Sequence, residues 1–252
     1  MTRQHSISFR AFLVAVVTAL IVGMLTTLAV RPPGKSVIRS AVSEAGSERE
    51  QLHWRVPSSF GTNWPVQGDV ITAVARFLES ATDGANRLEL FEPGELVPAF
   101  AITEAVRDRK TQAGFTWLGY DQGRIPASTL ISSVPFGMEP MEFIAWWYEG
   151  GGRELGEGLY NEHNVQPILC GVIGPETAGW FRERVRSIED FKGMKIRFAG
   201  LGGKVMQRLG ASVTMMPGAE IFQALEKGAI DATEFSMPAT DLPSRSISSR
   251  NH

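Results

Sequence analysis

The stretch KGMKIRFAGLGGKVMQRLGA, residues 192–211, decides the fold prediction because it describes a strand that turns at once into a helix. Ile196 and Phe198 alternate with Arg197, so the two apolar side chains share one face of the strand and the arginine occupies the other. A run of glycines that begins at Gly200 then marks the turn. These residues alone leave Arg197 two interpretations, a charge that faces solvent or a functional group.

The same glycines invite comparison with nucleotide-binding loops, and both comparisons fail. Val205 stands where the dinucleotide fingerprint has its third glycine, and Phe198 stands where the phosphate-loop pattern has its first. The glycines therefore indicate a tight strand-to-helix turn with a close approach of the backbone to a neighbour.

Outward from this stretch, apolar patterns of strand type alternate with patterns of helix type, which predicts an α/β fold with mostly parallel sheets. A first unit has predicted strands at 54–60, 86–91 and 113–119, and predicted helices at 69–84, 98–110, 140–151 and 153–164. A second unit has predicted strands at 165–174, 194–198, 212–217 and 231–235, and predicted helices at 176–185, 202–211 and 219–230. Two such units favour a ligand site between them.

Composition limits the class of protein. The chain has 252 residues, of which 43% are hydrophobic, so it can bury a substantial core. Its 25 Lys and Arg residues against 27 Asp and Glu residues give a net charge of −2, without the dense basic stripe that follows a phosphate backbone. Nucleic acid is therefore not an expected partner. The single cysteine, Cys170, forms no internal disulfide and leaves the compartment open.

The N-terminus predicts export. Arg3 and Arg10 precede an uncharged apolar run, Ala11–Val30, that is long enough to span a bilayer as a helix. We interpret residues 1–30 as a signal peptide or a retained signal anchor, and residues 31–51 as a linker. Both interpretations place the body of the protein outside the cytoplasm.

No catalytic constellation is evident, which predicts that the protein is not an enzyme. The HExxH and GxSxG patterns are missing from the sequence, and His53 and His163 lie in polar surroundings typical of surface residues.

Several motifs, in matching order and spacing, resemble one family. DFKGMKIRFAGLGGKVMQRLGA and PGAEIFQALEKGAIDATEF follow SVPFGM, WWYEGGG and GWF, and the first unit adds ATDG and FEPGELVPAF. From about Trp54 to Asp241 the chain resembles the extracytoplasmic solute-binding subunits of TRAP transporters, in the subgroup that binds α-keto or 2-hydroxy acids. The resemblance implies a periplasmic-binding-protein-like two-lobe fold that closes by a hinge around a small carboxylate.

The resemblance also implies roles for four residues. Arg197 matches the arginine that pairs with the substrate carboxylate, as a planar guanidinium can. Glu176, Glu234 and the backbone carbonyl of Phe235 match the groups that hold a bridging metal ion. This chain departs from the family twice, with Glu176 in place of glutamine and Phe235 in place of tryptophan.

The extra carboxylate favours Ca²⁺ as the bound cation, with Na⁺ as the alternative. A competing interpretation turns Glu176 outward at the start of a helix, where an acid is also favoured.

Further positions match pocket walls or turns of the family. Trp117 and Tyr120 are expected at the wall of the ligand pocket. For the remaining matching positions a ligand role and a purely structural role are equally open; they are Ser58, Ser59, Phe60 and Glu95. Arg109 replaces a glycine that the family commonly has at a helix end, which suggests an altered turn.

The C-terminus departs most from the family. Relatives continue with further strands and helices after the position of Asp241, whereas this sequence ends in LPSRSISSRNH. We therefore expect a first lobe over 52–163 that is incomplete, a second lobe over 164–241 and an aberrant polar tail over 242–252.

The expected function is periplasmic capture of a small organic acid for delivery to TRAP membrane subunits, with contact to the inner membrane if the N-terminal segment is retained. The alternatives are a membrane-tethered sensor or interaction module, a non-functional truncated remnant, and an enzyme that uses Glu176 and Glu234.

Overall fold

A computed structural model describes residues 51–241. The predicted export segment 1–30, residues 31–50 of the predicted linker and the predicted tail 242–252 lie outside the described residues. Within 51–241, none of the helices combines the length and the apolar character that a membrane crossing needs.

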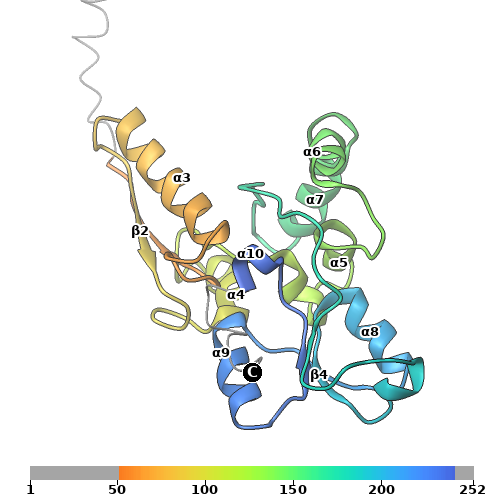
Figure 1. Cartoon of the computed structure of the whole chain (residues 1–252). Helices are drawn as coiled ribbons and strands as arrows, with labels where there is room; N and C mark the ends of the chain where they lie inside the picture. The colour runs from red at the N-terminus through yellow and green to blue at the C-terminus, as the bar shows by residue number, and fades with distance from the viewer. Residues whose placement is uncertain (1–50, 242–252) are drawn as a thin grey trace, which may run out of the picture. The chain divides into compact units, whose positions relative to one another are not determined.

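The first unit contains a small parallel sheet (Figure 1). Strand β1 (His53–Pro57) pairs with β2 (Arg87–Phe91), and helix α3 (Gln67–Ala81) connects them and packs beside β2. The predicted strand at 113–119 is reduced to one parallel bridge between Ser58 and Phe115, which extends the sheet beyond the end of β1.

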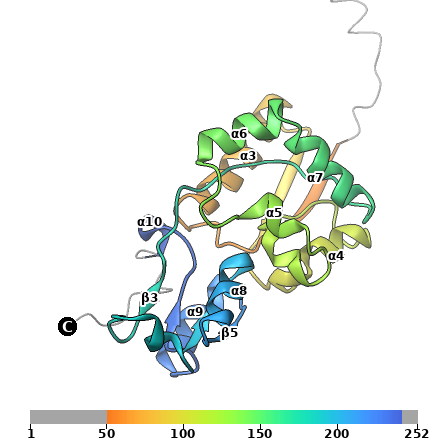
Figure 2. The ribbon, with the colours of Figure 1, turned by 90° about the vertical axis from the view of Figure 1, so that its right-hand side faces the viewer.

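Helical segments complete this unit, and α6 and α7 pack against each other (Figures 1 and 2). They are η1 (Ala99–Ala101), α4 (Ile102–Arg107), η2 (Leu118–Gly123), α5 (Ser128–Ser132), α6 (Pro140–Glu149) and α7 (Gly152–Asn161). Helix α6 begins as its sequence predicts, with Pro140 in the first turn and the Glu142 carboxylate accepting a hydrogen bond from the Glu139 N–H at 3.0 Å.

The second unit contains a four-stranded sheet in the order β3-β6-β4-β5. Its elements are β3 (Trp180–Phe181), η3 (Ile188–Phe191), β4 (Lys195–Arg197), α8 (Gly200–Arg208), β5 (Ser212–Thr214), α9 (Gly218–Glu226), β6 (Ala232–Thr233) and α10 (Pro238–Asp241). Strand β4 is parallel to both neighbours, and only β3 runs antiparallel. The predicted α/β class with mostly parallel sheets is confirmed, whereas the lobe boundary at 163/164 stays a prediction.

Two predicted elements of the second unit are wrong. Residues 165–174 form no strand, because this segment crosses from one unit to the other and its Gly171 lies against Val70 of α3 instead of pairing with a sheet. Residues 176–185 form no helix, because Gly179 adopts φ 143° and the next two residues pair with β6. Pairing with a sheet thus overrides the helical spacing of the apolar residues.

A shared hydrophobic core joins the two units. It combines Phe60 and Tyr120 from the first unit with Ile221, Ile230 and Phe235 from the second. Trp64 reinforces it, with its ring centroid 5.7 Å from that of Phe235 in an edge-to-face arrangement. This core gathers residues that follow the carboxyl ends of β1 and β6, Phe60 and Phe235, in one cluster.

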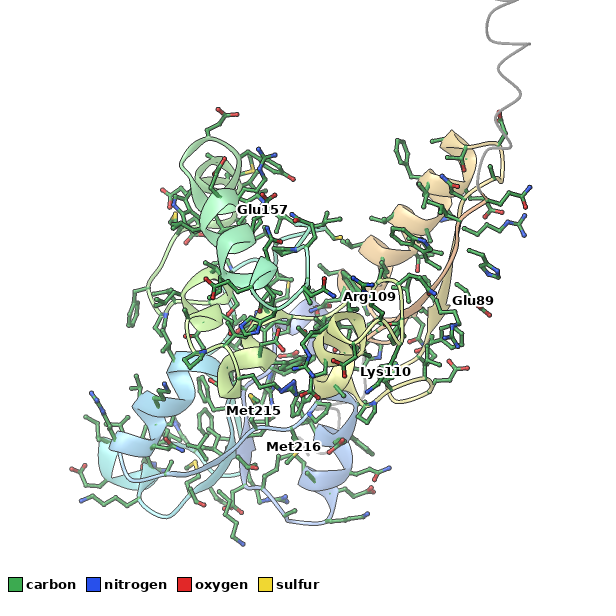
Figure 3. All side chains as sticks on the ribbon, turned by 180° about the vertical axis from the view of Figure 1, so that it is seen from behind. Glu89, Arg109, Lys110, Glu157, Met215 and Met216 are labelled. Carbon is green, nitrogen blue, oxygen red and sulfur yellow. The ribbon has the colours of Figure 1, made fainter. Side chains whose placement is uncertain are left out.

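Arg109 occupies the left-handed residue of a helix C-cap, as its replacement of a family glycine suggests (Figure 3). Its φ is 58°, its N–H donates to the Val106 carbonyl at 2.9 Å, and the Lys110 N–H donates to the Ala105 carbonyl at 2.8 Å. This pair of bonds is the Schellman motif, in which glycine is the favoured residue.

Replacing Arg109 by glycine is therefore expected to stabilise the protein. Relief of the left-handed strain outweighs the greater chain entropy of glycine in the unfolded state, so we expect a gain of about 0.5–1 kcal/mol. Thermal unfolding of Arg109→Gly measures it, and Arg109→Ala, which keeps the Cβ atom, should show no gain. A lower melting temperature for the glycine variant would contradict the strain argument.

Candidate ligand-binding site

Arg197 ends strand β4 inside the protein. The residue is 1% exposed and its neighbour Ile196 is 0% exposed, so both faces of the strand are covered. The interpretation of Arg197 as a solvent-facing charge is therefore wrong. A buried guanidinium must be paired, since an uncompensated charge in the interior is costly.

The partners of Arg197 come from two loops of the second unit. Its Nη1 donates to the Glu234 carboxylate Oε2 at 3.1 Å and to the Glu234 backbone carbonyl, and its Nε donates to the Met216 carbonyl at 3.2 Å. The guanidinium carbon lies 5.3 Å from the ring centroid of Phe235, within the range of a cation–π contact. Figure 3 labels Met216 and the neighbouring Met215 where these loops meet the first unit.

Glu234 follows β6 and is fixed by two elements at once. The residue is 6% exposed, and its Oε2 accepts the Ala199 N–H at 3.2 Å in addition to Arg197. Ala199 caps the start of α8, so the carboxylate lies at the positive end of that helix dipole. Gly200 makes the entry into α8 possible with a φ of 62°, and a Cβ atom on Gly203 would lie 2.9 Å from the Phe198 carbonyl oxygen. The glycine run is thus the tight turn that the sequence predicts.

Glu176 lies in the segment before β3 and interacts with Glu234. Desolvation raises the pKa of the Glu176 carboxyl, and the negative charge of Glu234 and a hydrogen bond with it raise that pKa further. The residue as a whole is exposed. No helix begins at Glu176, so the helix start in the competing interpretation is wrong, whereas the residue is exposed as that interpretation expects.

Aromatic side chains of the first unit border the arginine. Tyr120 is 6% exposed, and burial raises the pKa of its phenol to about 12, so the hydroxyl remains a hydrogen-bond donor at neutral pH. A hydrogen bond that the phenol oxygen accepts from Arg197 lowers the same pKa. Trp117 packs edge to face on Tyr120 with ring centroids 5.2 Å apart, and its ring edge borders Gly200 at the start of α8.

The structure gives three of the open positions local partners. The Ser58 hydroxyl donates to the Phe60 carbonyl at 2.6 Å, and the Ser59 hydroxyl bonds the Ala99 carbonyl and the Thr116 hydroxyl at 3.1 and 2.8 Å. The exposed Glu95 accepts the Glu92 N–H at 2.8 Å. These contacts favour structural roles, whereas Phe60 belongs to the aromatic core beside Tyr120.

Asp241 is a buried acid that sequence reasoning did not single out. It is 0% exposed, accepts the Trp180 Nε1–H at 2.9 Å and interacts electrostatically with Glu234 and Arg197. Trp180 belongs to the GWF motif and Asp241 lies in none of the quoted motifs, so the motifs do not connect the two residues. Their proximity depends on the antiparallel pairing of β3 with β6, which the helical interpretation of residues 176–185 excludes.

The predicted cation ligands form a set of hard oxygen donors. The set contains two carboxylates, Glu176 and Glu234, and the carbonyl of Phe235, which suits Ca²⁺ or Na⁺ and not a soft metal. Among the residues at 51–241, no three His, Cys, Asp or Glu side chains are arranged to hold one metal ion. The predicted set needs only two such side chains.

Sequence and structure comparisons agree on one family. The family model for bacterial extracellular solute-binding proteins, family 7 (DctP), matches residues 59–244. A monocarboxylate 2-oxoacid-binding periplasmic protein of Nostoc sp. is 39% identical over 193 residues, which are 75% of this chain and 52% of that protein. The chain thus spans about half the length of this curated relative.

Two crystal structures of TRAP periplasmic solute-binding proteins are similar. The protein from Pseudoalteromonas atlantica, with bound sodium and pyruvate, is 34% identical with a TM-score of 0.74, over 77% of this chain and 59% of that chain. The protein from Colwellia psychrerythraea, with bound calcium and pyruvate, is 31% identical with a TM-score of 0.73, over 78% and 60% of the two chains. These neighbours confirm the two-lobe fold. The chain belongs to family 7 of the bacterial extracellular solute-binding proteins, a class that binds solutes for transport.

Proposed function

We propose that this chain is the extracytoplasmic solute-binding subunit of a TRAP transporter and that it captures a small 2-keto or 2-hydroxy monocarboxylate together with a cation. The observation that carries the proposal is the buried Arg197, held against Phe235 and Glu234 at the end of a central strand. The similar proteins with bound pyruvate, and the relative named for 2-oxoacids, support this substrate class.

The geometry suggests how the carboxylate is bound. Nε and Nη1 of Arg197 already donate to Met216 and Glu234. Nη2 is therefore the nitrogen that donates to the ligand carboxylate. The Tyr120 hydroxyl, which stays protonated, is the second donor at this position. One carboxylate oxygen therefore faces a charged donor and the other a neutral donor, with Trp117 and Phe235 as apolar walls.

The cation is assigned to Glu176, Glu234 and the Phe235 carbonyl. When bound, it neutralises the paired carboxylates and offers open coordination positions to the oxygens of a 2-keto or 2-hydroxy acid. The chain's own residues bind and orient the acid and perform no chemical step. After export to the periplasm, the loaded protein delivers its ligand to the TRAP membrane subunits.

Calorimetric titration of the purified full chain with pyruvate tests the proposal. We expect saturable binding in the presence of Ca²⁺ or Na⁺, and its loss after chelation and dialysis into cation-free buffer. Methyl pyruvate, which lacks the ionised carboxylate, is the matched control and should give no binding. Equal binding of the ester, or no binding of any 2-keto or 2-hydroxy acid with either cation, would overturn the proposal.

A further inference from the structure

We infer that Asp241 determines the charge of the cation that the site accepts, acting as a third negative group that lies outside the ligand shell. The inference rests on the proposed function, because it concerns the same cation site. It assigns a role to a residue that none of the motifs singled out.

Asp241 is fixed by hydrogen bonds of its backbone and of its side chain. It is the last residue of α10, is 0% exposed, and donates its backbone N–H to the Met237 carbonyl at 3.0 Å. Its carboxylate Oδ2 accepts the Trp180 Nε1–H at 2.9 Å, and a backbone hydrogen bond from Ser236 also reaches the carboxylate. Ser236 directly follows Glu234 and Phe235, so Asp241 fixes the turn that carries two of the three predicted ligands.

The charged groups around the predicted cation site carry more negative than positive charge. Arg197 carries one positive charge, and Glu176, Glu234 and Asp241 carry three carboxyls, each of which interacts electrostatically with another member of the group. A monocarboxylate ligand adds a further negative charge. With all groups ionised the sum is about −3 before the cation enters, since the one arginine offsets one of four negative charges. A dication compensates twice as much of this charge as a monocation.

A charge effect of Asp241 and a packing effect differ in how they depend on the charge of the cation. Coulomb energy is proportional to the product of the charges, so one distant carboxylate stabilises Ca²⁺ about twice as much as Na⁺ at the same position. Loss of Asp241 as a charge should therefore lower Ca²⁺ affinity by the square of the factor by which it lowers Na⁺ affinity. Loss of a merely structural brace should lower both affinities by the same factor.

Titrations of the full chain with Ca²⁺ or Na⁺, without organic ligand, test this inference. The melting temperature at each cation concentration is the measured quantity, and it yields the affinity for the cation. Asp241→Asn keeps an acceptor for the Trp180 N–H and removes the charge, and we expect Ca²⁺ affinity to fall about tenfold and Na⁺ affinity about threefold. Asp241→Ser, a smaller side chain, is made in parallel in case the amide disturbs folding. Trp180→Phe keeps the charge and should change both affinities equally. The exposed Glu189→Gln removes a charge of η3, which supplies no residue to the site, and should change neither affinity.

The outcomes are distinguishable. Equal factors for Ca²⁺ and Na⁺ in the Asp241 variants would overturn the role of Asp241 and leave the cation site standing. Failure of the unmodified chain to bind either cation would overturn both the inference and the cation part of the proposed function.

Discussion

Replacing Arg197 by alanine is expected to abolish measurable binding of pyruvate. The ligand carboxylate loses its positively charged side-chain partner in a site where water is scarce, and truncation of one member of a buried charge pair costs about 2–5 kcal/mol, which is roughly a 30-fold to several-thousand-fold loss of affinity. Calorimetric titration in the presence of Ca²⁺ measures the effect. The exposed Arg208→Ala, at the end of α8, is the control and should bind normally.

The same substitution also threatens the fold, because Glu234 would keep a buried carboxylate without its counter-ion. Two milder variants separate folding from binding. Arg197→Lys keeps the charge but loses the planar fork that serves Met216, Glu234 and the ligand together. Tyr120→Phe removes only the second donor and should weaken pyruvate binding about tenfold, since a hydrogen bond to a charged group contributes about 1.5–3 kcal/mol. Unchanged affinity in folded Arg197→Lys and Tyr120→Phe proteins would contradict the assignment.

Local sequence signals predicted most of the elements around the site correctly. The alternation around Arg197, the glycine run after it and the apolar face of residues 219–230 correspond to β4, the start of α8 and α9. These signals succeed because each is contained within one element, where periodicity and backbone preference agree. The left-handed C-cap at Arg109 was predicted from a different source, the resemblance to a family that commonly has glycine at this position.

The segment between the two units shows where such signals fail. The helical spacing in 176–185 predicts a helix, but Gly179 and the pairing of Trp180 with Thr233 make it an edge strand. That pairing joins residues more than fifty positions apart, so no local pattern reports it. The error had a consequence for the site, because the strand is what brings Trp180 to Asp241 and the Glu176 carboxyl to Glu234.

Replacing Glu176 by glutamine is expected to shift the cation preference of ligand binding from Ca²⁺ toward Na⁺. In the unmodified chain, desolvation and the charge of Glu234 both raise the pKa of the Glu176 carboxyl, so an ionised Glu176 requires a nearby positive charge. A dication supplies two positive charges to the paired carboxylates of Glu176 and Glu234, whereas a monocation supplies only one. The amide of glutamine still offers an oxygen to the cation but carries no charge, which restores the donor set typical of the family.

The measurement is pyruvate affinity of the chelated protein after Ca²⁺ or Na⁺ is restored, for the unmodified chain and for Glu176→Gln. We expect the ratio of the two affinities to shift by at least about fivefold toward Na⁺, since one unit of charge at contact distance contributes about 1 kcal/mol or more even in a strongly screening medium. Glu183→Gln, an exposed change in the segment after β3, is the control and should leave the ratio unchanged. Full recovery of the unmodified chain with Na⁺ alone would show that the Glu176 carboxyl is neutral in the complex, as a protonated acid that mimics the glutamine. The preference for a dication would then have to be abandoned, while the carboxylate clamp at Arg197 would stand.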